Sequence, residues 1–576
     1  MMNKEISNAF KSPRKLTLDR LSFCHATVDD LRHWTVALSV MPLGDAAQAI
    51  LKAVLEISEL KCEETLRFDL IQVLQPNIEN VLHSLEKFFF DKNLIHTDRN
   101  EQIIELGNCL RGLTIAVYAD IARRSNQQIA QKKLPLFAIK QKNNLKIARQ
   151  LATYYALQQM CILLYKQQTL YSDSINYQWV LAHTLYDIAN KNNEIFLNIN
   201  QIQGTHLPVN NIAQIYAQLL LLDIFNTNQI RPTEIRALYY CSQDWAKMIQ
   251  ILPKETSLSR YFVNKKLDHA VIYNQKHNQG MDAHLFIETQ GLLEHINKTI
   301  VQEEDNITKT ERQYLTSALK FHVQNILSSS NERRHERYEY SAQLRICFSI
   351  FAAHYYLSNR IGFSETIMNA QSFTLHSASN TQNTIEQSPL TPTPAKLLDQ
   401  DSKQIYITEV LDISVNGYRI HWTGETPRNL RTGEFILVSE NNNRKWKGAI
   451  IRWIKQASNK SLELGLEVLG QDTFACAVRL QADLQNLNYQ PALLIQNHQL
   501  EYNKISLIIP NLSLFKEKQN IQLRLGKHEF QIQLTKAVII TQSFIQFDFE
   551  LLNNTQHYLI EDFILDQSDH FSLGET

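Results

Sequence analysis

The sequence predicts an α+β multidomain protein in which an irregular all-α helical bundle precedes a β-barrel and a second small β-rich barrel or sandwich. Two observations support this order. Six of the 15 glycines fall between residues 411 and 470, whereas the first 330 residues together also hold only six. Long helices need few glycines, but closely spaced strands need many turns. The spacing of apolar residues also changes along the chain, from the period of a helix to the period of a strand.

Apolar residues in the first 330 positions recur at spacings of three, four and seven, which indicates amphipathic helices. Two examples are Ile103, Leu106, Leu110, Leu113 and Val117, and Ile147, Leu151, Tyr154, Cys161 and Leu164. We expect residues 1–25 to form an N-terminal arm and 26–330 a helical domain without a fixed repeat. The segment 259–273 is less helical, which leaves room for a small β insertion near 259–287.

Residues 377–403 are rich in Ser, Thr, Asn, Gln and Pro and offer little apolar area to offset the entropy of ordering. We therefore expect a disordered insertion over about 362–403. Beyond it, "SLELGLEV" places Leu462, Leu464, Leu466 and Val468 on one face of a strand. Farther on, "IQLRL" and "FQIQL" flank "GKHE", which predicts a hairpin within a C-terminal β-rich domain over 484–570.

Composition excludes several classes of function. Lys+Arg and Asp+Glu both count 58, so the overall charge gives no support to nucleic-acid binding, and any anion site must be local. The seven cysteines are scattered, which fits buried thiols in a reducing compartment. With no secretion signal and no apolar stretch of about 20 residues, we expect a cytoplasmic protein without a membrane span.

Enzyme and metal motifs are missing from the sequence. No phosphate-binding GxxxxGK[ST] loop, HExxH pair or nucleophile motif occurs, so we expect neither catalysis nor a bound metal. His284 and Glu288 have helical spacing but no third ligand nearby, which favours a surface pair. Trp422, Trp446 and Trp453 lie on predicted strands, and we expect them in the barrel core.

Two short motifs stand out against this background. "NERRHERYEY" gathers Arg333, Arg334 and Arg337, and "DISVNG" supplies Asp412, Ser414 and Gly417. Each has a plain structural explanation: arginines paired with Glu332 and Glu336 at the end of a helix, and an Asx-type turn closing a hairpin.

Together the two motifs resemble the signature of PilZ domains, RxxxR followed by [D/N]xSxxG. Arg333 and Arg337 match the first pattern, with Arg334 as the additional arginine, and Asp412, Ser414 and Gly417 match the second. The resemblance covers roughly residues 331–475 and includes "LRTGEFILV", "WKGAIIRWI" and "LELGLEVLG" as successive strands. Asp412 follows Arg337 by 75 residues, which is longer than usual and requires an insertion between the motifs.

The resemblance implies a PilZ-like β-barrel that binds cyclic di-GMP through these six residues. Arginine suits this ligand because its guanidinium contacts phosphate bidentately and stacks on purines. Asp412 would accept hydrogen bonds from guanine, Ser414 would add a hydroxyl group, and Gly417 would allow a positive φ or a close backbone approach.

We expect a cytoplasmic effector without a cofactor that relays the nucleotide level through its helical domain to a protein partner in motility, pilus or biofilm control. The chain has no GGDEF, EAL or HD-GYP signature for making or degrading the nucleotide. The alternative is an interaction scaffold with a degenerate barrel that docks into a motility, pilus or secretion assembly. A weaker possibility is an RNA or polyanion contact, which the neutral charge disfavours.

Overall fold

The structure is a computed structural model of the 576-residue chain. It describes residues 2–90, 94–131, 139–204, 206–274, 284–300, 307–328, 338–367, 403–414, 416–440, 445–457, 461–480, 489–497, 504–553 and 556–572. The chain forms two compact units. The first comprises Met1–Thr227, Pro232–Thr316 and His322–Asn331, and the second comprises Asn228–Arg231, Ser317–Phe321 and Glu332–Thr576.

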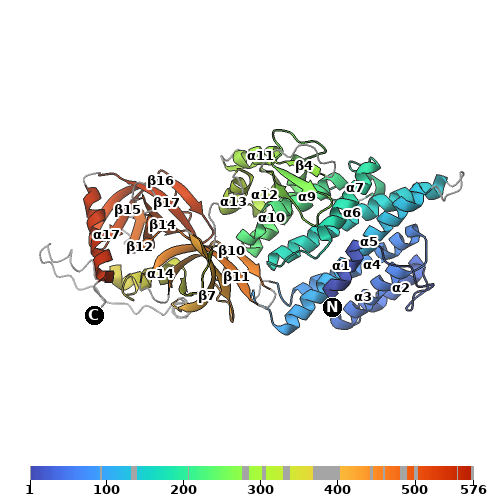
Figure 1. The fold of residues 1–576 in the computed structure, drawn as a ribbon, viewed down its shortest axis with the longest axis horizontal. Helices are drawn as coiled ribbons and strands as arrows, with labels where there is room; N and C mark the ends of the chain where they lie inside the picture. The colour runs from blue at the N-terminus through green and yellow to red at the C-terminus, as the bar shows by residue number, and fades with distance from the viewer. Residues whose placement is uncertain are drawn as a thin grey trace, which may run out of the picture. The chain divides into compact units, whose positions relative to one another are not determined.

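The first unit is mainly helical (Figure 1). Its helices are α1 (Met2–Lys11), α2 (Val28–Leu38), α3 (Leu43–Glu59), α4 (Glu64–Glu86), α5 (Asp98–Ala130), α6 (Ile139–Thr169), α7 (Gln178–Lys191), α8 (Ile199–Gln203), α9 (Ile212–Ile224), α10 (Pro232–Trp245), α11 (Gln290–Ile300) and α12 (Lys309–Tyr314), with α13 (Ser317–Ser328) divided between the units. Short 3-10 turns lie at Thr227–Gln229 and Ala246–Met248. The predicted helical N-terminal region is thus confirmed.

The long helices α5 and α6 form the centre of this unit. Leu110, Leu113 and Val117 of the predicted stripe on α5 are buried. On α6 the prediction was less accurate, because Ile147 is 43% exposed. The middle of α6 is buried on almost every side. Its apolar residues therefore do not form a single stripe, and their spacing does not predict whether Ile147, near the start of the helix, is buried.

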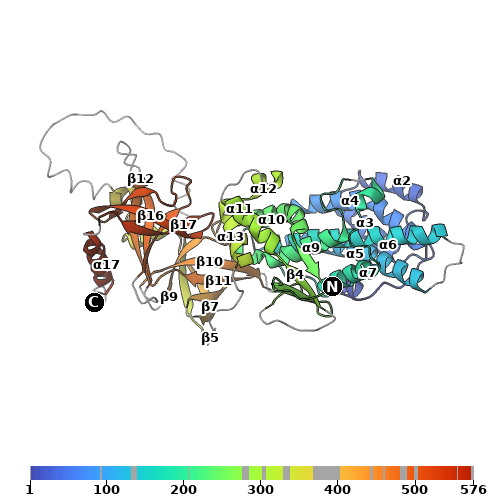
Figure 2. The same cartoon turned by 90° about the horizontal axis from the view of Figure 1, so that it is seen from above.

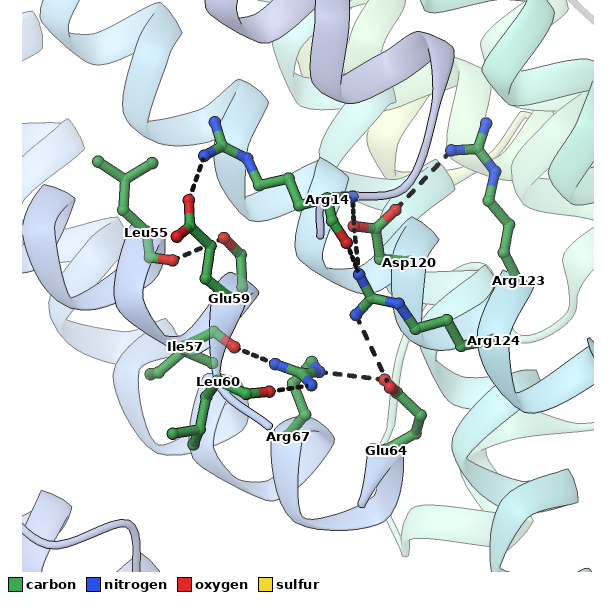
Figure 3. A network of polar contacts seen from close by, with 11 residues as sticks. Arg14, Leu55, Ile57, Glu59, Leu60, Glu64, Arg67, Asp120, Arg123 and Arg124 are labelled. Carbon is green, nitrogen blue, oxygen red and sulfur yellow. Dashed lines mark hydrogen bonds and ion pairs between the residues drawn. The ribbon is translucent and has the colours of Figure 1, made fainter. Parts of the chain in front are cut away.

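The N-terminal segment is held against α5 by a buried polar network (Figure 3). The backbone N–H of Arg14 donates to Asp120 Oδ2 at 3.0 Å, and Arg124 donates to the Arg14 carbonyl oxygen. Arg124 also lies 3.7 Å from Glu64, which pairs with the fully buried Arg67. Because these charged groups are removed from water, each needs its partners, and the network fixes the segment in one register.

A four-stranded antiparallel sheet lies in the segment that the sequence indicated as less helical. It consists of β1 (Gln250–Leu252), β2 (Tyr261–Asn264), β3 (Ile272–Tyr273) and β4 (His284–Glu288), in the order β1-β4-β2-β3. Val263, Leu285 and Ile287 are buried.

The second unit contains two β-barrels (Figures 1 and 2). The first is built from β5 (Tyr338–Glu339), β6 (Gln343–Phe348), β7 (Tyr406–Ser414), β8 (Gly417–Trp422), β9 (Phe435–Glu440), β10 (Lys447–Gln456) and β11 (Leu462–Val468). Their order is β5-β7-β6-β9-β10-β11-β8, and an additional pairing of β7 with β8 closes the ring, with β5 attached at its edge. Phe348, Tyr406 and Trp422 pack together as an aromatic cluster.

The second barrel is closed in the order β12-β13-β14-β17-β16-β15. Its strands are β12 (Asp472–Leu480), β13 (Gln490–Asn497), β14 (Lys504–Pro510), β15 (Asn520–Leu525), β16 (His528–Ile540) and β17 (Phe544–Leu551). The predicted hairpin is confirmed, because β15 pairs with β16 in the register Ile521↔Ile532 and Leu523↔Phe530, with all four side chains buried. Helix α17 (His557–Ser572) adds Ile560 and Ile564 to this core.

A helix that follows β6 packs between the two barrels. Helix α14 (Ile350–Leu357) buries Ala352, Ala353 and Leu357 in a cluster that also contains residues of both barrels, including Leu437 and Leu493. Residues 363–367 form a further helical turn. Of the insertion predicted over 362–403, residues 368–402 lie outside the described residues. In the part of the chain that is described, no helix combines the length and apolar character that a membrane span requires.

Candidate functional site

The hairpin of β7 and β8 positions the downstream motif. Ser414 pairs with Gly417 and Asp412 pairs with Arg419. The Ser414 hydroxyl donates to the Gly417 carbonyl oxygen at 3.4 Å. A register shift follows between Val410 and Asp412. The hairpin thus holds Asp412, Ser414 and Gly417 close together, as the motif requires.

Gly417 is required by a close backbone approach to the neighbouring strand. A Cβ atom at this position would lie 2.0 Å from the Leu466 carbonyl oxygen of β11, a contact that no side chain could tolerate. The φ angle of Gly417 is not in the positive region. Of the two explanations that the sequence left open, the structure thus selects close approach, and the approaching group is a strand of the same barrel.

Asp412 forms an ion pair on the outer face of the barrel. Arg419 donates through Nη1 to Asp412 Oδ2 at 3.1 Å and through Nη2 to Glu463 Oε2 at 2.8 Å. The side chains of Arg419, Asp412 and Glu463 are 36%, 13% and 23% exposed. Burial alone would lower the pKa of Arg419, but the hydrogen bonds to Glu463 and Asp412 outweigh it and raise this pKa.

Sequence reasoning missed Arg419 and Glu463, although part of the signal was present. Ser414 pairs with Gly417 and, two residues farther along each strand, Asp412 pairs with Arg419. Opposite residues in an antiparallel pair share one face, so their contact could have been expected. The contribution of Glu463 depends on β11 being the next strand, which the hairpin alone does not reveal.

A tryptophan lies on the same row of the sheet as this ion pair. Arg419 pairs with Gly465 of β11, and Gly465 pairs with Trp453 of β10. A Cβ atom at Gly465 would lie 1.9 Å from Trp453 Nε1, so the indole covers the glycine. Trp453 is only partly buried. The outer face therefore carries an acidic, a basic and an aromatic side chain in one row.

The prediction that three tryptophans lie in the barrel core is confirmed for Trp422, which is 3% exposed. Trp446 is also buried, at 8% exposed, but in the cluster that α14 forms between the two barrels. The prediction is wrong for Trp453, which lies on the outer face. A bulge in β10 causes the difference, because the register shifts between Ile451 and Trp453. The extra residue, Arg452, reverses the alternation of inward and outward side chains and turns Trp453 to the outer face.

Strand β5 brings the end of the upstream motif to the downstream motif. Tyr338 pairs with Ile413 and Glu339 pairs with Asp412. Arg333, Arg334 and Arg337 lie outside the residues that the structure describes. Tyr338 follows Arg337 directly in the chain. The long separation in sequence therefore does not keep the segment after the arginines away from Asp412.

His284 and Glu288 are not a helical surface pair, as the sequence suggested, because both lie on strand β4. His284 is 6% exposed and packs against Phe262 and Phe286, while Glu288 accepts a hydrogen bond from Thr256. Among the described residues, no group of three or more His, Cys, Asp or Glu side chains could hold a metal ion.

Comparison with known proteins matches three successive regions of the chain to one family. Residues 29–255 match the N-terminal domain of the cyclic-di-GMP receptor FimW, residues 261–392 and 369–473 match its middle PilZ domain, and residues 476–552 match its C-terminal β-barrel domain. The cyclic-di-GMP receptor FimW of Pseudomonas aeruginosa is 24% identical over 570 residues, covering 92% of each chain. Comparison with solved structures gave no significant match.

Proposed function

Because this chain is a PilZ-family protein whose three regions match the domains of a cyclic-di-GMP receptor, we propose that it binds cyclic di-GMP. The proposed site is the outer face of the first barrel beside the β7–β8 hairpin. Its residues are Arg333, Arg334, Arg337, Asp412, Ser414 and Gly417.

The observation that carries the proposal is the pairing of β5 with β7. Glu339 lies opposite Asp412, and Tyr338 lies opposite Ile413. A residue joined to Tyr338 by one peptide bond has its Cα atom about 3.8 Å away. Arg337 is that residue, which supports its inclusion in the proposed site with Asp412.

The chemistry of this face suits a ligand with two phosphodiester charges and two guanines. The arginines would neutralise phosphate and stack on a purine face. The Asp412 carboxylate accepts a hydrogen bond from Arg419, and a carboxylate offers about four lone-pair sites, so it can also accept from guanine N–H donors. The partly exposed indole of Trp453 offers a further stacking surface. Two or three charged hydrogen bonds of roughly 1.5–3 kcal/mol each, with stacking, are enough for about micromolar affinity.

The proposed output is a relay to a protein partner without catalysis. A ligand that binds one arrangement of the arginine segment better than another shifts the population toward that arrangement. By thermodynamic linkage, a partner that recognises the same arrangement binds more tightly when nucleotide is present. We place the partner's docking surface on the helical domain, residues 26–330 in the division predicted from the sequence, and its setting in the cytoplasm.

Isothermal titration calorimetry of the full chain with cyclic di-GMP tests the proposal, with cyclic GMP as the matched control nucleotide. We expect saturable binding of cyclic di-GMP at micromolar concentration or tighter and at least tenfold weaker binding of cyclic GMP. Cyclic GMP has a single phosphodiester and a single base and could occupy only part of the face. A titration in which cyclic di-GMP gives no binding heat with the folded protein would reject the proposal.

The ion pair of Asp412 with Arg419 gives some support to the alternative, a scaffold whose barrel no longer binds nucleotide. Arg419 is itself held by Glu463, so Asp412 starts with a partner that a ligand must share or displace. The same titration separates the two functions, because a scaffold would give no binding even though the protein is folded.

A further inference from the structure

One long segment of the helical unit contains no acidic residue. Residues 121–172 hold nine lysines and arginines and no aspartate or glutamate. At the chain's average composition, a segment of this length would carry roughly five acidic residues. The chain as a whole is neutral, with 58 residues of each sign, so this segment is a local excess of positive charge.

Cations near the core of the unit form ion pairs, whereas the lysines at the start of α6 form none with the carboxylates that the structure describes. Paired cations of this segment are Arg123 and Arg124 with Asp120, Arg149 with Glu194, and Lys166 with Glu86. Among the described residues, no carboxylate forms an ion pair with Lys140, Lys142 or Lys146. Lys140 and Lys142 are exposed to solvent, and Lys146 is partly exposed.

Two isoleucines on the same turns are also left in solvent. Ile139 is 69% exposed and Ile147 is 43% exposed. Residues 139, 142, 143, 146 and 147 follow helical spacing, so the isoleucines and two of the lysines share one side of α6. This stripe is not part of the helical core, which begins with Leu145, Ala148 and Arg149 on the other side.

Helix stability does not account for these lysines. The first turn of α6 contains no acidic residue and carries lysines instead. Cations near a helix N-terminus meet the positive end of the helix dipole, and an acidic residue would be favoured there by a few tenths of a kcal/mol. The surface also lies at the end of the α5–α6 pair, which Figures 1 and 2 both show projecting outward from the helical unit.

We propose that Ile139, Lys140, Lys142, Lys146 and Ile147 form a surface that binds peripherally to a membrane containing anionic lipids. Charge complementarity requires an anionic partner, because the surface has only cations and no acid nearby in sequence. A lipid surface is favoured over an acidic protein by the mixture of lysine and exposed isoleucine. Lysines attract phosphate headgroups, while isoleucines enter the boundary between headgroups and acyl chains.

Co-sedimentation with vesicles tests this proposal on the full chain without added nucleotide, so its outcome does not depend on cyclic di-GMP binding. We expect binding to mixed phosphatidylglycerol and phosphatidylcholine vesicles at low salt, little binding to phosphatidylcholine alone, and weaker binding as salt shortens the Debye length below about 10 Å. Each lysine near an anionic surface is expected to change the partition coefficient roughly fivefold.

The variant Lys140→Gln/Lys142→Gln/Lys146→Gln should therefore lower partitioning on the order of 100-fold. Ile139→Ser/Ile147→Ser should lower it about tenfold, because apolar area no longer enters the lipid. The matched control is Lys247→Gln/Lys254→Gln/Lys298→Gln, which removes the same charge from exposed positions elsewhere in the unit and should partition as the unaltered protein does. Equal losses in the control and the test variant would overturn the proposal.

An acidic protein partner would give a different pattern. The unaltered chain would then bind soluble polyglutamate through the three lysines but would not sediment with anionic vesicles. That result, or sedimentation that does not respond to either the lysine or the isoleucine variant, would contradict a lipid-binding surface. All five positions are exposed or partly exposed, so we expect the variants to keep the melting temperature of the parent protein.

Discussion

Arg419 donates a hydrogen bond to Asp412 across the β7–β8 hairpin at 3.1 Å, while the same guanidinium is held by Glu463. Asp412 is therefore held in a fixed place before any ligand arrives. Arg419 keeps Glu463 as a partner when the Asp412 side chain is removed. A substitution of Asp412 should therefore affect nucleotide binding more than the stability of the barrel.

Asp412→Ala should weaken cyclic di-GMP binding at least tenfold and change the melting temperature little. The lost ion pair is partly exposed, and such pairs contribute about 0–1 kcal/mol to stability. Calorimetry and thermal unfolding on the same preparation provide the two measurements. Glu463→Ala is the control, since it disturbs the same network but leaves Asp412 with Arg419. A large drop in melting temperature for Asp412→Ala would instead make Asp412 a structural residue of the turn.

Arg333→Ala and Arg337→Ala should each weaken cyclic di-GMP binding at least tenfold. Each would remove a charged contact to phosphate or guanine that contributes roughly 1.5–3 kcal/mol. Arg428→Ala removes an exposed arginine from the loop before β9 and should bind as the parent protein does. If both test variants keep the parent affinity, the arginine segment is not part of the site.

Gly417→Ala should destabilise the first barrel. The added Cβ would lie 2.0 Å from the Leu466 carbonyl oxygen, and neither strand backbone can move without breaking the β8–β11 pairing. Overpacking of this kind typically costs about 1–3 kcal/mol, which denaturant unfolding can measure. Gly44→Ala is a matched control, because no atom lies within 4 Å of its added Cβ and the position is in helix α3. It should be neutral or slightly stabilising.

Some contacts of the candidate site could be predicted from the sequence, and others could not. The strand period and the short turn fix the contact of Asp412 with Arg419, because pairing continues unbroken from Ser414 and Gly417. The orientation of Trp453 could not be predicted, since one extra residue at Arg452 reverses the alternation and no pattern in "WKGAIIRWI" marks the bulge. Likewise, helical spacing placed Ile147 on a face of α6 but could not show that its side chain stays 43% exposed among the described residues.

Glu311 should make the stability of the helical unit depend on acid pH. Burial alone would raise its pKa, but hydrogen bonds from His295, the Trp245 indole and the Thr308 amide outweigh burial and lower the pKa to about 2. The stabilisation is then complete above the unfolded pKa of 4.5 and is lost as pH falls toward 2. Its size is on the order of 3 kcal/mol.

Glu311→Gln tests this dependence by denaturant unfolding between pH 2 and pH 7. The variant should be less stable than the parent protein at pH 7, and the difference should shrink as the pH approaches 2. Glu294→Gln is the control, because it makes the same change of side chain at an exposed position on α11. If the difference in unfolding free energy between the variant and the parent protein stays constant with pH, Glu311 stabilises the unit through its packing and not through its charge.

Shortening the segment between the two motifs should leave nucleotide binding intact. Ile346 of β6 pairs with Tyr406 of β7, so the chain leaves and re-enters the barrel on neighbouring strands, and β5 pairs with β7 independently of the segment between them. Closing a loop costs only about 0.6 kcal/mol for each doubling of its length.

Replacing residues 376–398 with a short Gly/Ser bridge keeps α14, the following turn and both barrels. We therefore expect calorimetry to give an affinity within a few-fold of the parent value. If the shortened protein keeps its melting temperature but no longer binds cyclic di-GMP, the segment itself contributes to the site, and the proposed grouping of Arg333 and Arg337 with Asp412 and Ser414 is incomplete.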